Sequence, residues 1–145
     1  MTGASMEVFT EAWCVACCER MNESEAYRQA AATWEGSAVL VMTADATQGV
    51  PEERAAWLDM HHGACRGTRM ATDADFDDAA YVFESDPATW RRLLSGDTDP
   101  VAAAMAGKLR LTKGNLFTLA KYAQAAREMV VAAGAAGGTF PATAG

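Results

Sequence analysis

The sequence predicts an α+β fold in which a five-stranded sheet is covered by helices over one face. Helix-forming runs occupy both ends of the chain, and short β-branched or alternating runs occupy its middle. The clearest boundaries lie in residues 95–122. There Asp99 and Pro100 begin a short Ala-rich helix, and Asn115 caps the last helix. Between them residues 108–111 alternate polar and apolar side chains, which predicts a strand.

The other elements follow in order along the chain. Apolar residues at helical spacing predict a first helix over 6–21, and strong helix formers predict a second over 24–32. Apolar or alternating runs predict four strands, joined mostly as an antiparallel meander, over 38–42, 54–62, 64–71 and 79–83. The acidic run 72–78 is interpreted as a solvated loop. A proline-initiated helix over 87–94 and a last helix over 116–133 complete the pattern.

Length and charge restrict the class of protein. At 145 residues the chain forms one domain, expected over residues 6–133, with a low-complexity tail over 134–145 expected to be disordered. The net charge of −7 argues against a nucleic-acid partner. No apolar run is long enough for a membrane-spanning helix, and no signal-peptide pattern begins the chain. We therefore expect a cytoplasmic protein whose four cysteines are thiols.

Three cysteines, Cys14, Cys17 and Cys18, lie close together in the first predicted helix. Their spacing places the sulfurs on one face, where they could contribute three ligands to a soft metal or act in redox chemistry. A redox C-x-x-C normally begins a helix directly after a strand, whereas residues 8–11 already read as helix. The favoured interpretation is that these cysteines are small apolar side chains on a packed face.

A second candidate cluster is the segment around His61, His62 and Cys65. A Cys–His pair can form a nucleophile, and both residue types bind zinc. Adjacent residues of a regular strand point to opposite faces, so His61 and His62 would not reach the same ion. No oxyanion loop is visible either. The sequence therefore assigns no catalytic residue, no metal ligand and no cofactor, and predicts a protein that is not an enzyme.

Small and flexible side chains leave two interpretations open. Alanines surround Met105, and Met42 falls on a predicted core face. Such residues allow helices and sheet to approach closely, which by itself makes a good core. They can equally leave an apolar cavity whose methionines adapt to a ligand.

The residues in this order resemble the sterol carrier protein type 2 (sterol-binding) domain family, of the single-domain archaeal and bacterial type. The resemblance runs from about residue 8 to residue 132 and is most specific in the second half. The segments that carry it are Phe83-Glu84-Ser85-Asp86, Leu93-Leu94-Ser95-Gly96, Asp99-Pro100, Met105-x-Gly107-Lys108-Leu109-x-Leu111 and Gly114-Asn115. The first half contributes Asn22-Glu23, Ala26-Tyr27, Trp34-Glu35-Gly36 and Trp57-Leu58-Asp59-x-x-His62-Gly63-x-Cys65-Arg66.

The resemblance implies a five-stranded mixed sheet and an apolar tunnel between sheet and helices. It also implies binding or transfer of a fatty acid, acyl-CoA, sterol or other lipid, without shared catalytic residues. Of the residues in this sequence, we expect the lining to include Met42, Leu58, Val82, Trp90, Leu94, Met105, Leu116 and Leu119.

In the strand over 79–83, the facing of alternate side chains that the resemblance implies also bears on oligomeric state. It would turn Ala80 and Val82 to the helices and expose Tyr81 and Phe83, a patch that suggests a homodimer contact. Two alternatives to lipid binding remain: a metal or redox protein that uses Cys14, Cys17 and Cys18, and a structural dimer that has lost the tunnel.

Overall fold

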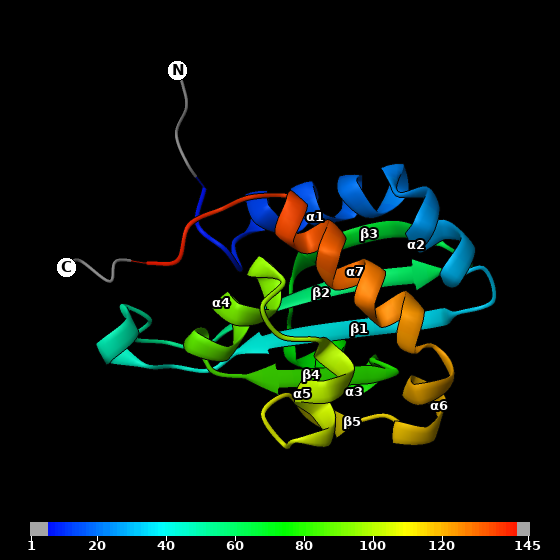
Figure 1. Cartoon of the computed structure of the whole chain (residues 1–145). Coiled ribbons are helices and arrows are strands. Elements are labelled where there is room, and N and C mark those ends of the chain that lie inside the picture. Colours follow the sequence, from blue (N-terminus) through cyan, green and yellow to red (C-terminus); the bar gives the residue numbers. More distant parts are fainter. Residues whose placement is uncertain (1–5, 142–145) are drawn as a thin grey trace.

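A five-stranded mixed sheet with the strand order β3-β2-β1-β4-β5 lies at the centre of the protein, which a computed structural model describes over residues 6–141 (Figure 1). The strands are β1 (Glu35–Met42), β2 (Arg54–His61), β3 (Ala64–Met70), β4 (Tyr81–Ser85) and β5 (Arg110–Lys113). The α-helices are α1 (Glu11–Glu23), α2 (Glu25–Ala30), α3 (Asp73–Asp78), α4 (Pro87–Ser95), α5 (Pro100–Met105), α6 (Leu116–Lys121) and α7 (Ala123–Ala135). A short 3-10 turn, Ala46–Gln48, precedes β2.

The first three strands form an antiparallel meander, and the chain then crosses to the other side of β1. There β4 pairs in parallel with β1, and β5 pairs antiparallel with β4 at the edge of the sheet. The predicted α+β class with a mixed sheet is confirmed. The crossover makes β1 and β4 neighbours at the centre, where the last five residues of β1 and four of the five residues of β4 are buried.

The register of β4 corrects the predicted facing of this strand. Leu40 pairs with Phe83, and parallel partners share a face, so Phe83 and Tyr81 point toward the main helical layer. Val82 points to the opposite face, where it packs with Val39 and Val41. The prediction that Val82 faces the helices is therefore wrong. Tyr81 and Phe83 are buried, so they do not form the exposed dimer patch that the alternation suggested.

The second face of the sheet is partly covered by α3, in the acidic run that the sequence predicts as a loop. Thr72 and Asp75 form a reciprocal capping box, which satisfies backbone N–H groups at the start of the helix. The Arg69 guanidinium donates to both carboxylate oxygens of Asp75, at 3.1 and 2.6 Å. This bidentate contact holds the pKa of Asp75 at about 2. Phe76 then packs against the valines beneath it.

The predicted last helix is interrupted at Tyr122, which separates α6 from α7. Tyr122 adopts φ −107° and ψ 29°, outside the helical range. Its ring stacks on Trp34 with centroids 5.6 Å apart, and its hydroxyl lies 3.0 Å from the Thr33 hydroxyl. These contacts with the segment before β1 hold the break in place, so α7 lies across the sheet while α6 turns toward β5 (Figure 1).

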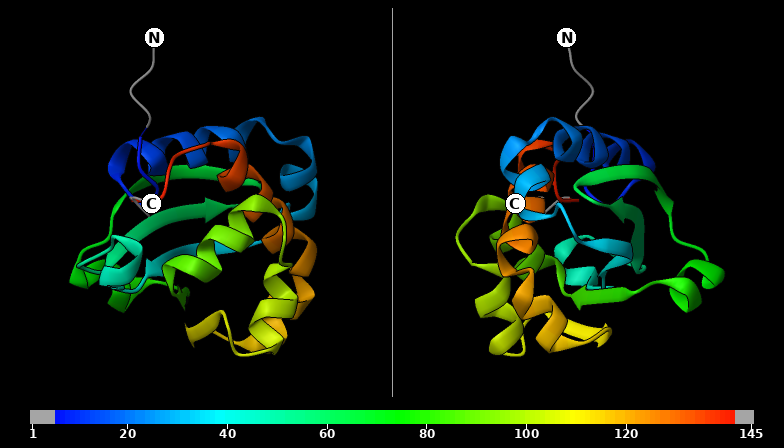
Figure 2. Two further views of the ribbon diagram at one scale, coloured as in Figure 1. Left: turned by 60° about the vertical axis from the view of Figure 1, so that its left-hand side comes forward. Right: turned by 90° about the vertical axis from the view of Figure 1, so that its right-hand side faces the viewer.

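The two described ends of the chain lie together, as Figure 2 shows. The Val8 N–H donates to the Thr139 carbonyl at 3.0 Å, and Phe140 packs against the main core. The ring of Phe140 also lies 4.6 Å from the guanidinium carbon of Arg91. Residues 134–141, predicted as part of a disordered tail, are therefore packed, and the predicted boundary at 133 falls inside α7. The remainder of that predicted tail, 142–145, lies outside the described residues.

Candidate functional site

A wholly apolar cavity lies between the sheet and helices α4 and α7. Its volume is about 20 Å³, which is room for about one water molecule. The lining residues come from both central strands, from the three helices α4, α5 and α7, and from the segment before β5. They are Leu40, Phe83, Trp90, Leu94, Pro100, Leu109, Ala126, Met129, Val130 and Ala133. A surface without polar groups offers nothing to hold water, so this space is suited to hydrocarbon.

Helix α4 forms one wall of the cavity, and its position is fixed by local contacts. Asp86 caps the helix by accepting from the Thr89 N–H at 2.7 Å, and Pro87 occupies its first turn. The Trp90 indole N–H donates to the Val41 carbonyl at 2.8 Å, which anchors the helix to the central strand. The indole ring also meets the Phe9 ring edge to face, at 5.2 Å between centroids. The indole is thus a fixed wall of the cavity.

Only two of the eight residues predicted as lining, Trp90 and Leu94, line this cavity. Met42, Leu58 and Leu119 belong to the same main core but do not line it.

The other three predicted lining residues lie elsewhere. Val82 is on the far face of the sheet. Met105 is 73% exposed and Leu116 is 48% exposed, so both side chains face away from the cavity.

Several lining residues were not predicted from the sequence. Leu40 and Phe83 lie on central strands whose runs are apolar on both faces, so the pattern does not give their facing. Ala126, Met129, Val130 and Ala133 recur at spacings of three and four in α7. This helical periodicity identifies the inner face of α7 from sequence alone.

A surface groove of about 320 Å³ lies beside the cavity, between α5, β5 and the start of α6. It is lined by Ala104, Gly107, Leu109, Arg110, Leu111, Gly114 and Leu116. Leu109 lines both the groove and the cavity, so its side chain stands between them. Next to the groove, Phe117 is 88% exposed, and Met105 and Leu116 add further apolar surface. An exposed apolar patch of this kind indicates a place where the protein meets an apolar partner or ligand.

The segment that forms the groove carries only basic charges in its sequence, although the whole chain carries a net charge of −7. Residues 100–127 contain no Asp or Glu, and their basic residues are Lys108, Arg110, Lys113, Lys121 and Arg127. Arg110 pairs with Glu84 and Arg127 pairs with Asp99, at 2.6 and 2.5 Å. Lys113 donates to backbone carbonyls of the α3 segment. Within residues 6–141, the ammonium groups of Lys108 and Lys121 make no ion pair or hydrogen bond, so they are free to meet an anion.

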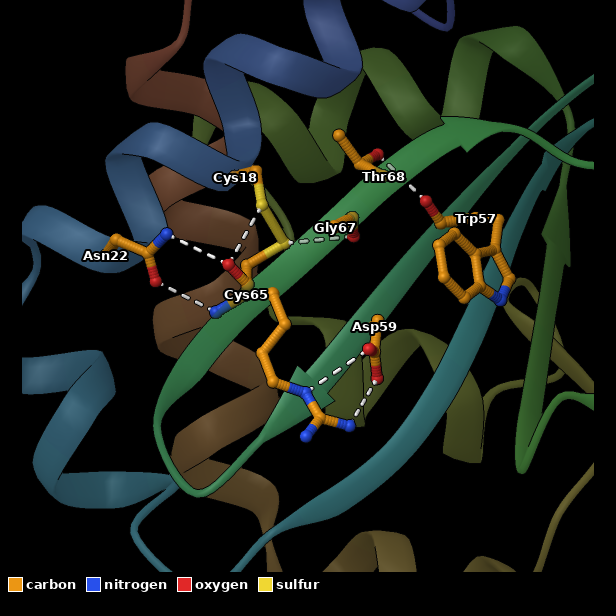
Figure 3. Close-up of a disulfide and its surroundings, with 8 residues drawn as sticks. Cys18, Asn22, Trp57, Asp59, Cys65, Gly67 and Thr68 are labelled. Carbon is orange, nitrogen blue, oxygen red and sulfur yellow. Dashed lines mark hydrogen bonds and ion pairs between the residues drawn. A yellow bond between two sulfur atoms is a disulfide. The ribbon is translucent and has the colours of Figure 1, made fainter.

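The cysteine cluster contains a disulfide between Cys18 of α1 and Cys65 of β3 (Figure 3). The expectation of four thiols is therefore wrong. The disulfide forms because α1 packs along β3. This packing brings the Cα atoms of two cysteines that are 47 residues apart in the sequence to 5.3 Å. The Asn22 side chain reinforces the contact, since it donates to the Cys65 carbonyl at 3.0 Å and accepts from the Cys65 N–H at 2.8 Å.

The remaining two cysteines, Cys14 and Cys17, are buried thiols. Burial raises the pKa of Cys14 to about 11 and raises that of Cys17 further, because the charged thiolate would be desolvated. Neither thiol is activated, since a reactive cysteine has a lowered pKa. Within residues 6–141, no cluster of three potential metal ligands includes a cysteine. The geometry does not favour the metal or redox interpretation of Cys14, Cys17 and Cys18.

Comparisons with known proteins agree with this geometry. The model of the SCP-2 sterol transfer family matches residues 16–127. A crystal structure of sterol carrier protein 2 is 48% identical, with a TM-score of 0.79, covering 88% of this chain and 97% of its own. A solution structure from Thermus thermophilus, of a conserved hypothetical protein described as possibly sterol carrier protein, is 47% identical, with a TM-score of 0.81 and coverage of 95% and 96%.

A more distant structure shares the fold alone. The apo form of sterol carrier protein 2 from Yarrowia lipolytica is 15% identical, with a TM-score of 0.58, covering 83% of this chain and 88% of its own. A search of curated proteins finds no match.

Proposed function

Because the chain belongs to the SCP-2 sterol transfer family, we propose that it binds a fatty acid, acyl-CoA or sterol-like lipid between the sheet and the helices, and carries it. Family membership supports lipid binding and transfer in general. The observation that supports this particular site is the apolar cavity between the central strands, α4 and α7. Burial of a hydrocarbon chain there would contribute about 0.8 kcal/mol per CH₂ group.

The cavity must enlarge to accept a lipid. Its volume of about 20 Å³ is far below the roughly 300–1,000 Å³ of ordinary ligand pockets. The groove of about 320 Å³ is separated from it by Leu109. We infer that displacement of Leu109, together with α5, β5 and α6, joins the two spaces into one tunnel. Trp90, Leu94, Leu116, Leu119 and Met105 would then line it, with Met42 and Leu58 in the floor.

The free cations beside the groove favour a ligand with an anionic head. Lys108 and Lys121 would meet a carboxylate or phosphate, which a fatty acid or acyl-CoA carries and a sterol lacks. We therefore propose that acyl ligands bind more tightly than sterols.

No reaction is proposed for this chain. The ten residues that line the cavity contain no titratable or nucleophilic side chain, and proteins with the SCP-2 domain are generally carriers of lipids rather than enzymes. Among residues 6–141, no helix has the length and apolar character needed to cross a bilayer. We propose the cytoplasm as the location of the protein. In that reducing compartment, Cys18 and Cys65 would exchange between the disulfide and two free thiols.

The proposal is tested with tag-free, delipidated protein titrated with palmitate and, separately, with cholesterol. Palmitate is expected to raise the melting temperature and to be retained in native mass spectra. Ala126→Leu places three further carbons in the cavity and should weaken palmitate binding about tenfold, or by roughly 1.4 kcal/mol. Ala88→Leu adds the same group to an exposed position of α4 and should leave binding unchanged.

A second variant tests whether the free cations beside the groove bind the anionic head of the ligand. Lys108→Glu combined with Lys121→Glu should weaken palmitate binding and leave cholesterol binding unchanged. If neither lipid binds, or if Ala126→Leu binds palmitate as well as the parent protein while remaining folded by circular dichroism, the cavity is not the lipid site.

A further inference from the structure

The tip of the β2–β3 hairpin brings both histidines of the chain together with a glutamate. His61 is the last residue of β2, and Glu35 is its direct cross-strand partner at the start of β1. His62 follows in the turn. The His62 Nε2 lies 2.9 Å from the Glu35 carboxylate, and the His61 Nδ1 lies 3.8 Å from the same oxygen. The three ligand atoms all lie within 4.8 Å of one another.

The two histidines share one side of the hairpin because the strand ends between them. His62 adopts φ +49°, a left-handed conformation that a regular strand does not contain. The backbone turn brings the two imidazole rings into a stack, with centroids 4.0 Å apart. The sequence argument that adjacent strand residues diverge fails at this point, because His62 is a turn residue.

The backbone of this cluster is fixed independently of the side chains. The His62 N–H donates to the Trp34 carbonyl at 2.8 Å, so the turn is tied to the residue before Glu35. Gly63 has φ +86°, and a Cβ at this position would stand 2.6 Å from the Arg28 carbonyl oxygen. The turn therefore keeps its shape, and the backbone positions of the three residues are set before any ion binds.

We propose that Glu35, His61 and His62 bind a divalent transition-metal ion, with Zn²⁺ as the best match. Two imidazole nitrogens and one carboxylate oxygen form a known three-ligand zinc set, which leaves a fourth position for water or an anion. Zinc ligands at about 2.0–2.2 Å in a tetrahedron lie roughly 3.3–3.5 Å apart. The observed separations of 2.9 and 3.8 Å fall on either side of that range.

Binding requires a change at the side chains only. A metal ion lies in the plane of each imidazole that binds it, so the stacked rings must turn apart. All three side chains are 40–62% exposed and can rotate without disturbing the core. Arg28 lines the same surface pocket as His62 and opposes a cation, whereas Glu25, also in that pocket, favours one. The bound ion would tie the start of β1 to the tip of the β2–β3 hairpin.

The test uses tag-free, chelator-treated protein and ZnCl₂. Isothermal titration should give one site per chain, and NMR should show both histidine ring signals shifting together. Because the chain has only two histidines, these signals report this site alone. The melting temperature should rise with Zn²⁺ concentration, since Glu35 joins the two histidines only in the folded chain. MgCl₂, a hard cation that prefers oxygen ligands, should cause none of these changes.

Three variants each remove one ligand: Glu35→Gln, His61→Ala and His62→Asn. Each should weaken Zn²⁺ binding by at least about tenfold. Asn is chosen at position 62 because it tolerates the positive φ of this residue, so the variant is expected to fold. Glu53→Gln is the matched control: it removes an exposed carboxylate at the opposite end of β2 and should leave binding unchanged. The proposal is overturned if the parent protein shows no shift of the histidine signals in a large molar excess of Zn²⁺, or if His61→Ala/His62→Asn binds Zn²⁺ as tightly as the parent.

Discussion

At the scale of single residues, Gly134 determines how closely α4 and α7 approach above the cavity. A Cβ built on Gly134 would lie 2.3 Å from the Leu94 carbonyl oxygen, much closer than any real contact. Leu94 itself lines the cavity. The absence of a side chain at this helical position is therefore a packing requirement, and the cavity depends on it.

Gly134→Ala should destabilise the protein, although Ala normally stabilises a helix interior relative to Gly by roughly 0.5–1 kcal/mol. The overpacked contact with backbone should cost about 1–3 kcal/mol and exceed the gain in helix propensity. Urea unfolding measures the change. Val131→Ala, on the exposed side of the same helix, is the control and should change stability by less than about 0.5 kcal/mol. An equal or higher stability of Gly134→Ala would show that the two helices separate easily.

The residue scale also shows where sequence reasoning loses information. The run Ala79–Phe83 is apolar at every position, so it has no alternation from which to read a facing. The facing follows from pairing with β1, which is a long-range contact. The inner face of α4, by contrast, can be read from its sequence, because polar residues separate its apolar ones, and Trp90 and Leu94 of that face border the cavity.

At the scale of elements, the Cys18–Cys65 disulfide links α1 to the β2–β3 hairpin. It closes a long loop, and removal of such a bridge typically costs about 2–4 kcal/mol. Asn22 makes two hydrogen bonds to the backbone of Cys65, which do not involve the disulfide and join the same elements. We therefore expect reduction to weaken the docking of α1 without releasing it.

Reduction should lower the free energy of unfolding by about 2 kcal/mol, at the lower end of the usual range. The measurement is urea unfolding with and without a reductant. Cys18→Ser/Cys65→Ser should match the reduced parent protein and should not respond to reductant, which separates the disulfide from general effects of the reagent. If oxidised and reduced parent proteins unfold at the same urea concentration, the bridge does not constrain the chain.

The sequence predicts the ends of a helix well where a local capping residue sets them, and poorly where contacts with distant residues set them. Asp99 and Asn115 begin α5 and α6 as the sequence predicts. The division of α6 from α7 was not predictable, because Tyr122 is held out of the helix by Trp34 and Thr33, far away in sequence. Helix α3 was missed for a different reason: its acidic composition obscured the capping box of Thr72 and the contact of Arg69 with Asp75.

At the scale of the whole molecule, the buried central strands and the short exposed elements are separate parts of the fold. The central strands β1 and β4 are mostly buried and have a neighbouring strand on each side. The segment from α5 to α6 instead contains two six-residue helices and a four-residue edge strand that is largely exposed. Lys108 and Lys121, whose ammonium groups make no ion pair within residues 6–141, lie in the same segment. The likeness to sterol carrier structures concerns the whole fold. Under the proposed function, a ligand would change the segment from α5 to α6, whose elements are short and exposed.

This division predicts a pattern of hydrogen exchange. Without ligand, amides of residues 100–121 should exchange orders of magnitude faster than those of β1 and β4, because short exposed elements open locally at low free-energy cost. Palmitate should slow exchange in residues 100–121 and in α7, and leave the central strands unchanged. Ala126→Leu serves as the control, since palmitate should no longer protect that segment in it. If palmitate instead slows exchange around β2 and β3, the ligand binds at the other edge of the sheet, because bound ligand suppresses local opening where it makes contact.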